Sequence, residues 1–264
     1  MDVWRKGIDA ERFRPDFKDA GMRFNMTGGD GGGDVPDGED KTFLITYIGR
    51  LGAEKRIKDI KPVLEALGPN ARLSIVGTGP QEDELKEHFA GTKTVFLGQL
   101  TGDDLSKAFA TGDAFVMPSD SETLGFVVLE SMASGVPVVA AKAGGIVDLI
   151  DDGVDSFLVE PGNTEAFVAR LRELRDTKGL SEKIGAAGRA EAEKWSWEAA
   201  TSVLRNVQYE KAIYNFSRKK KSVWQRAKLR LWSGAAKVKL LFGGGQGGRE
   251  KEDQEEKEET TVLS

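Results

Sequence analysis

Six short apolar runs, each followed by a segment with helical spacing, dominate the chain from residue 42 to residue 194. Strands that are buried on both faces of a parallel sheet read as continuous apolar runs, and helical crossovers connect them. The pattern therefore predicts a doubly wound, Rossmann-like α/β fold in which helices cover both faces of one parallel sheet. The expected strands are Thr42–Ile48, Arg72–Val76, Thr94–Leu97, Ala114–Met117, Pro137–Ala141 and Ser156–Val159.

The segments between and after these runs carry apolar residues three and four positions apart, the spacing of a helix with one buried face. Ile60, Val63, Leu64 and Leu67 are an example. Gly135 is expected to end the helix that precedes it. The expected helices are Ile57–Leu67, Gln81–Phe89, Asp104–Ala110, Thr123–Ser134, Ile146–Ile150, Glu165–Arg175, Leu180–Lys194 and Trp197–Phe216.

The N-terminal segment has a different composition from the rest. Residues 28–40 hold six glycines and five acidic residues, too few apolar groups to bury a core. We therefore expect residues 1–41 to be a connector, with a mobile surface loop over residues 18–41. The nucleotide-binding domain is expected to span residues 42–216.

The C-terminal segment is charged unevenly. From Arg218 to Lys239 there are nine Lys or Arg residues and no acidic residue, and apolar residues recur every three or four positions. This pattern predicts a basic amphipathic helix over residues 217–242. Residues 243–264 are glycine-rich and then acidic, and we expect them to be disordered.

Charge and composition exclude several kinds of site. The formal net charge is −5, so there is no overall signature of nucleic-acid binding. The absence of cysteine excludes disulfides, thiolate metal sites and cysteine nucleophiles. A single histidine, His88, excludes a His-rich metal cluster and argues against a Ser-His-Asp triad. No residue pattern indicates a metal site, and no run of 18 apolar residues predicts a membrane-spanning helix.

Two acidic residues mark the stretch that follows the fourth expected strand. Glu122 and Glu130 lie eight residues apart, with the short turn Thr123-Leu124-Gly125 directly after the first. Free backbone N–H groups at the start of a helix bind anions such as a diphosphate. A carboxylate on the helix can accept hydrogen bonds from the diol of a ribose. The stretch therefore predicts a site for an anionic ligand that bears hydroxyl groups.

Glycines and cations follow the first two expected strands. Gly49 and Arg50 end the first strand, and Lys55 follows within one turn, so two cations are available for phosphate oxygens. Gly77-Thr78-Gly79 ends the second strand and is interpreted as a tight turn beside the ligand. A Walker loop is absent, and the third glycine of a dinucleotide fingerprint is missing, which disfavours an NAD-linked dehydrogenase.

Several motifs together resemble those of a known enzyme family. They are G-R-L-x3-K over residues 49–55, G-x-G-P from Gly77, F-L-G-x-L from Phe96, and the run over residues 113–139 that contains Glu-x7-Glu. These motifs resemble the nucleotide-sugar half of retaining glycosyltransferases with the two-Rossmann GT-B architecture, the group 1 glycosyl transferases. Within this family the chain is similar to the sulfoquinovosyltransferases of sulfolipid synthesis in photosynthetic organisms, over residues 3–221.

The resemblance implies transfer of sulfoquinovose from UDP-sulfoquinovose to diacylglycerol with retained anomeric configuration, without a metal or other cofactor. Glu122 would be the catalytic residue that faces the donor sugar. Arg50 and Lys55 would bind the diphosphate together with the amides of the turn, and Glu130 would bind the ribose. Gln99 and Leu100 would lie against the uracil. The implied substrate-binding residues are Gly49, Arg50, Lys55, Gly77, Gln99, Leu100, Thr123, Leu124, Gly125 and Glu130.

The resemblance also implies partners. GT-B enzymes carry an N-terminal acceptor domain, whereas residues 1–41 match the connector, so we expect this chain alone to bind a UDP-sugar without transferring it. Residues 218–242, with Trp224 and Trp232, are expected to bind a membrane surface. The implied location is peripheral, at the thylakoid or inner envelope membrane of a chloroplast, or at a cyanobacterial membrane.

Two alternatives stay open at this point. One is another lipid glycosyltransferase of the same superfamily with UDP-glucose or GDP-mannose as donor. The other is a non-catalytic nucleotide-binding fragment. The two transferase interpretations differ in base and sugar contacts, which the sequence does not fix.

Overall fold

The computed structural model describes residues 7–29, 42–196, 201, 211 and 213–217. The chain divides into two units, Met1–Leu204 and Arg205–Ser264. In the first unit, described residue 201 is helical, and in the second so are residues 211 and 213–217, as expected for a helix over residues 197–216. The expected basic helix over residues 217–242 and the expected tail lie outside the described residues, apart from residue 217.

The first unit contains one six-stranded sheet with the strand order β3-β2-β1-β4-β5-β6, in which every neighbouring pair is parallel. This is the order of a doubly wound Rossmann sheet, so the predicted fold class is confirmed. The six strands match the expected runs to within one or two residues: β1 Phe43–Ile48, β2 Ala71–Val76, β3 Thr94–Gly98, β4 Ala114–Met117, β5 Val138–Ala141 and β6 Phe157–Val159.

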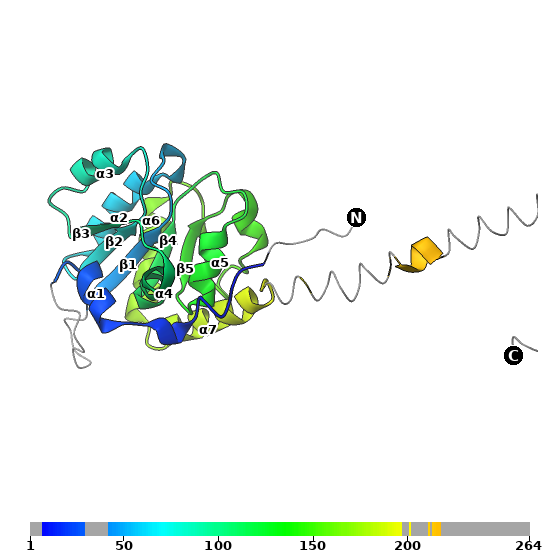
Figure 1. Ribbon diagram of the computed structural model, residues 1–264. Helices are drawn as coiled ribbons and strands as arrows, with labels where there is room; N and C mark the ends of the chain where they lie inside the picture. The colour runs from blue at the N-terminus through cyan, green and yellow to red at the C-terminus, as the bar shows by residue number, and fades with distance from the viewer. Residues whose placement is uncertain (1–6, 30–41, 197–200, 202–210, 212, 218–264) are drawn as a thin grey trace, which may run out of the picture. The chain divides into compact units, whose positions relative to one another are not determined.

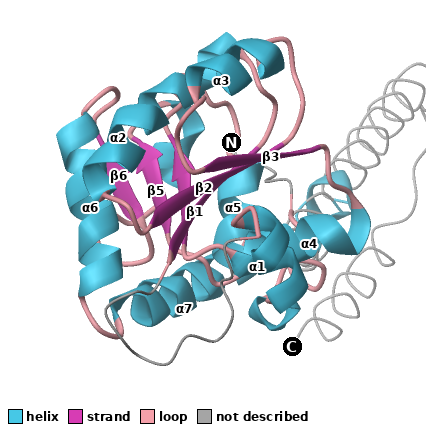
Figure 2. Ribbon diagram, turned by 90° about the vertical axis from the view of Figure 1, so that its left-hand side faces the viewer, coloured by secondary structure: helices cyan, strands magenta, loops and turns pink. Residues whose placement is uncertain are grey.

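Helices cover both faces of the sheet (Figures 1 and 2). On one face, α2 packs against α6, and on the other, α5 packs against α7 and α1 against α4. The helices are α1 Ala20–Met26, α2 Ile60–Leu67, α3 Glu82–His88, α4 Gly102–Thr111, α5 Phe126–Ala133, α6 Thr164–Asp176 and α7 Leu180–Glu193. Short 3-10 helices span Pro15–Phe17, Ala53–Lys55, Ile57–Asp59 and Gly144–Asp148. Within the described residues, no helix is long and apolar enough to cross a bilayer.

The two-sided cover explains why the central strands are mostly apolar. All residues of β1, β2, β4 and β5 are buried, whereas the edge strand β3 is half-buried. Tyr47 and Phe115 are among the largest side chains that are completely enclosed. The positions of β1, β4 and β5 were therefore readable from the sequence as nearly continuous apolar runs, whereas buried β2 also holds Arg72 and Ser74.

The expectation of a mobile loop over residues 18–41 was wrong for its first part. Ala20–Met26 is a helix, with the Asp19 carboxylate accepting a hydrogen bond from the amide of Met22 at its start. Met22 and Met26, four residues apart, are buried against the domain. The sequence analysis missed this helix because its apolar pattern is short and a glycine-rich segment follows it. Residues 30–41 lie outside the described residues.

One long side chain fixes α1 to the sheet. Both terminal nitrogens of Arg23 donate to the Asp113 carboxylate, over 3.1 and 2.8 Å, and Asp113 also accepts from the amide of Leu44 in β1.

The connector that precedes α1 is also held by one arginine side chain. Arg189 of α7 donates to the carbonyl oxygens of Ala10, Phe13 and Ala133.

Three helix boundaries differ from those expected. The helix expected at Thr123 begins only at Phe126, because Gly125 has a left-handed backbone with φ 61°. The helix expected from Ile57 starts with a separate 3-10 turn, since the chain bends at Arg56. The helix expected over residues 146–150 is a 3-10 helix over residues 144–148.

Candidate functional site

Three loops meet at the carboxyl edge of the sheet, around the strand where the order reverses. β1 pairs with β2 on one side and with β4 on the other. The loops in question are residues 49–56 after β1, residues 77–79 after β2 and residues 118–125 after β4. In open α/β sheets this reversal point is where ligands bind. Most of the expected site residues lie in these three loops.

The glycines after β1 and β2 allow two loops to run side by side. The amide of Gly49 donates to the carbonyl of Val76 over 2.9 Å, and the amide of Leu51 donates to that of Thr78 over 3.0 Å. A Cβ on Gly77 would overlap the carbonyl oxygen of Gly49. The structure therefore gives Gly77 a packing role, and its predicted contact with a ligand stays a prediction.

An ion pair joins the loop after β1 to the loop after β4. The Nζ atom of Lys55 donates to Oε2 of Glu122 over 2.6 Å, and both side chains are 17% exposed. The buried hydroxyl of Tyr47 lies next to this pair and donates to the carbonyl of Arg50 over 3.0 Å. Burial raises the pKa of Tyr47 above its ordinary value, and the negative charges of Glu122 and Glu54 raise it further.

Further contacts hold the loop after β4 in place. The fully buried hydroxyl of Ser119 lies 3.0 Å from the carbonyl oxygen of Glu54, which links the same two loops. The amide of Gly145 donates to the carbonyl of Glu122 over 2.8 Å. A Cβ on Gly144 would overlap that same carbonyl oxygen. Gly144 and Gly145 were not among the predicted site residues, although two adjacent glycines shortly after an apolar strand were the available signal.

The turn between Glu122 and α5 presents backbone amides. The side chains of Thr123 and Leu124 are exposed, and Gly125 precedes the first residue of α5. In the described structure the amides of these three residues donate no hydrogen bond to another residue. Together with the positive end of the α5 dipole they can bind a negatively charged group. The structure thus places the predicted anion-binding turn beside the Lys55–Glu122 pair.

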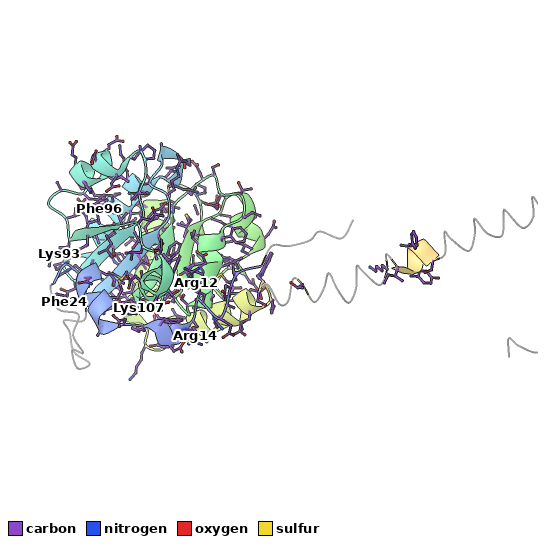
Figure 3. All side chains as sticks on the ribbon, in the orientation of Figure 1. Arg12, Arg14, Phe24, Lys93, Phe96 and Lys107 are labelled. Atoms are coloured by element: carbon purple, nitrogen blue, oxygen red, sulfur yellow. The ribbon has the colours of Figure 1, made fainter. Side chains whose placement is uncertain are left out.

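Glu130 lies on α5 and differs from Glu122 in its surroundings. It has no ion pair with any other described residue. Burial raises the pKa of Glu130 to about 7, and the positive charge of Arg12 opposes this only partly. Arg12 comes from the connector before α1 and is labelled in Figure 3. Glu130 is thus a half-buried acid with a raised pKa, and its carboxylate can accept hydrogen bonds from a hydroxyl-bearing ligand.

The remaining predicted residues lie at the same edge but farther apart. Arg50 is 67% exposed and pairs with Glu54 over 3.4 Å, so its guanidinium is accessible to a ligand. Gln99 is exposed and Leu100 half-buried, directly after the edge strand β3. The structure brings Lys55 and Glu122 into contact, and the uracil contact of Gln99 and Leu100 stays a prediction. In the part of the chain that is described, no three His, Asp or Glu residues gather as a metal site.

Comparison with known proteins fits this geometry. The family model described as "Glycosyl transferases group 1" matches residues 35–191, more than half of the chain. The chain belongs to this glycosyltransferase family. Its matched region contains all of the predicted site residues.

Among curated members of the glycosyltransferase family, the chain is 46% identical over 224 residues to a sulfoquinovosyl transferase from Arabidopsis thaliana, covering 84% of this chain and 42% of that protein. It is 31% identical to a GDP-mannose-dependent alpha-mannosyltransferase from Corynebacterium glutamicum, covering 76% of this chain and 45% of that protein. The chain thus spans less than half the length of either relative.

Solved structures in the same fold support the architecture. HepE from Anabaena, determined in complex with UDP and glucose, aligns with a TM-score of 0.65 at 21% identity, over 78% of this chain and 55% of that one. Sucrose-phosphate synthase from Thermosynechococcus elongatus also aligns with a TM-score of 0.65, at 23% identity, over 81% and 53% of the two chains. At these identities the likeness establishes the fold: the chain has the Rossmann-like half of a GT-B glycosyltransferase.

Proposed function

We propose that this chain is the donor-binding half of a retaining sulfoquinovosyltransferase, which transfers sulfoquinovose from UDP-sulfoquinovose to diacylglycerol in sulfolipid synthesis. The observation that carries the proposal is the Lys55–Glu122 pair beside free amides at the start of α5, in a chain 46% identical to a plant sulfoquinovosyl transferase. The group of cations, amides and acids matches what a sugar diphosphate offers: negative charge, and hydroxyl groups on both sugars.

Each group has a distinct task in this proposal. Lys55, Arg50 and the amides of residues 123–125 bind the diphosphate, and they stabilise the negative charge that it gains when its bond to the sugar breaks. Glu130 accepts hydrogen bonds from the ribose hydroxyls. Glu122 faces the donor sugar as the catalytic residue. The ammonium group of Lys55 has three N–H donors, so it can bind phosphate while it holds Glu122 at 2.6 Å, and the two anions then compete for its charge.

A binding experiment tests the proposal. Isothermal titration calorimetry of the chain with UDP, GDP and ADP is expected to show the tightest binding for UDP, with no added metal or other cofactor. A matched titration in the presence of a chelator is expected to give the same dissociation constant for UDP. Absence of binding for every nucleoside diphosphate would overturn the proposal.

A second candidate function is supported by one specific observation. The 31% identity to a GDP-mannose-dependent mannosyltransferase favours a lipid glycosyltransferase with another donor, such as GDP-mannose or UDP-glucose. Tighter binding of GDP than of UDP in the same titration would favour this alternative. If the whole protein bound UDP-glucose and UDP-sulfoquinovose equally well, the assignment of uracil as the base would stand. The assignment of sulfoquinovose as the donor sugar would then have to be changed.

We also propose that residues 218–242 hold the protein at a membrane, since diacylglycerol resides there. These residues lie outside the described structure, and the proposal rests on their nine Lys and Arg residues and on Trp224 and Trp232. Each cation near an anionic lipid surface contributes about 1 kcal/mol. Flotation with anionic vesicles is expected to recover the chain and to lose it when residues 218–242 are deleted. Equal recovery of both would contradict the proposal, and its chloroplast location is tested by imaging the tagged whole protein.

A further inference from the structure

Arg56, next to Lys55 in the sequence, has a backbone conformation that arginine rarely adopts. Its φ is 52° and its ψ is 33°, the left-handed region, and it is the one non-glycine residue with positive φ among the described residues. Such a conformation destabilises a side-chain-bearing residue, and it persists where the surroundings hold it. Arg56 separates the 3-10 turn that ends with Lys55 from the one that begins at Ile57.

The surroundings that hold Arg56 come from three loops. Its Nε atom donates to Asp59 over 2.8 Å, next to α2. Its Nη1 atom donates over 3.1 Å to Asp120, in the loop after β4. Its Nη2 atom lies beside Gly162, after β6, where a Cβ would stand only 3.1 Å away. One guanidinium therefore joins the loops that follow β1 and β4 and lies beside the loop that follows β6.

Arg56 lies close in the sequence, directly or through Asp120, to both residues of the Lys55–Glu122 ion pair. Lys55 precedes it directly, and Asp120 stands two residues before Glu122. The Arg56–Asp120 contact thus lies parallel to the Lys55–Glu122 contact and joins the same two loops. Arg56 is 34% exposed and Asp120 48% exposed, and ion pairs with this exposure contribute little to overall stability. A role in geometry accounts for the strained backbone better than a role in stability.

We propose that Arg56 and Asp120 are positioning residues, which hold Lys55 and the loop of Glu122 in register for the diphosphate of the donor. This inference rests on the proposed function for its ligand. It predicts that loss of the contact weakens the binding of phosphate groups and leaves the binding of the nucleoside alone.

The primary variant is Asp120→Asn, which keeps the shape of the side chain and removes the negative charge from its contact with Arg56. Titration with UDP is expected to show a dissociation constant about fivefold higher, since a small displacement of a charged binding group is costly. Titration with uridine, followed by NMR, is expected to give an unchanged constant. If Asp120 had a merely structural role, the variant would bind UDP and uridine more weakly by the same factor.

Two further variants complete the test. Arg56→Gly removes the same contact and is expected to reproduce the fivefold loss for UDP without lowering the melting temperature, because glycine adopts the left-handed backbone freely. Lys58→Gln is the matched control: it breaks an ion pair of similar exposure, with Glu84 of α3, that does not involve the loop after β4. It is expected to leave both ligands unaffected.

Hydrogen exchange of the ligand-free chain separates this inference from the proposed function. Asp120→Asn and Arg56→Gly are expected to speed exchange in residues 118–123 and to leave the sheet unchanged. If the wild-type chain binds no UDP, the proposed function fails, and the exchange measurement still decides the positioning role. Unchanged exchange in that loop in both variants, or unchanged UDP affinity in a chain that binds UDP, overturns the inference.

Discussion

The loop after β4 and helix α5 each carry one acid of the candidate site, and the two acids are neutralised in different ways. Glu122, on the loop, lies 2.6 Å from the ammonium group of Lys55. Glu130, on the helix, has no ion pair with any described residue, and burial raises its pKa to about 7. The residue type is the same and the separation is only eight positions, so the difference comes from the neighbours alone.

This difference assigns the two acids different tasks. The charge of Glu122 is compensated within the protein by Lys55, and in the proposed function the diphosphate of the donor competes for this lysine. The charge of Glu130 has no such partner, so the hydroxyl groups of a ligand are its natural hydrogen-bond donors. We therefore expect a competing anion to affect the ion pair of Glu122. We expect the hydrogen bonds of Glu130 to depend on pH and on the hydroxyl groups of the ligand. Four experiments test this contrast.

The largest effect is expected for the stability of a Glu130→Gln variant. A folded-state pKa of about 7 against an ordinary 4.5 means that the wild type loses stability as pH rises from about 4.5 to 7. This loss amounts to about 3 kcal/mol, and the variant lacks it, since glutamine does not ionise. Urea unfolding at pH 5 and pH 8 measures it. An equal pH dependence in wild type and variant would show that Glu130 ionises normally.

The next largest effect is expected for Lys55→Met, measured as UDP affinity. Loss of a charge-assisted hydrogen bond to phosphate weakens binding by about 2 kcal/mol, or roughly 30-fold. Lys58→Met, which also removes a paired lysine, is the control and is expected to bind like the wild type. Isothermal titration calorimetry gives both constants. A loss below threefold would exclude Lys55 from the phosphate site.

A smaller effect is expected for the ribose hydroxyl. The wild type should bind UDP about fivefold more tightly than 2′-deoxy-UDP at pH 8, because one hydrogen bond to the ionised Glu130 is lost. The preference is expected to shrink at pH 6, where Glu130 holds its proton, and to be equally small in Glu130→Gln at both pH values, because an uncharged amide accepts a weaker hydrogen bond. An undiminished preference in the variant at pH 8 would place the ribose against another residue.

The smallest effect, opposite in sign, is expected for Glu122→Gln. Since glutamine no longer holds Lys55 by charge, UDP should bind about threefold more tightly, in line with the modest strength of a partly exposed ion pair. In the Lys55→Met background the same change is expected to have no effect on UDP affinity. Weaker binding in the single variant would mean that Glu122 shapes the loop rather than competes with the ligand.

The strands were predictable because burial on both faces leaves a direct mark on the sequence. Each of the six apolar runs became a strand, and the residues at their carboxyl ends became the site. The short helix Ala20–Met26 was missed, because its apolar spacing is only two methionines long and glycine-rich sequence follows it. The start of α5 was misplaced by three residues, since the left-handed backbone of Gly125 is not visible in the order of residue types.

The site, too, was predictable from the sequence only in part. The types and spacing of Lys55, Glu122 and Glu130 were enough by themselves to predict a site for an anion with hydroxyl groups. Only the tertiary structure decided which acid meets the lysine, because that contact joins residues 67 positions apart across the reversal of strand order. It also decided that burial raises the pKa of Glu130 and that Arg56 joins the loops after β1 and β4, since burial and contacts between loops depend on how the strands are ordered.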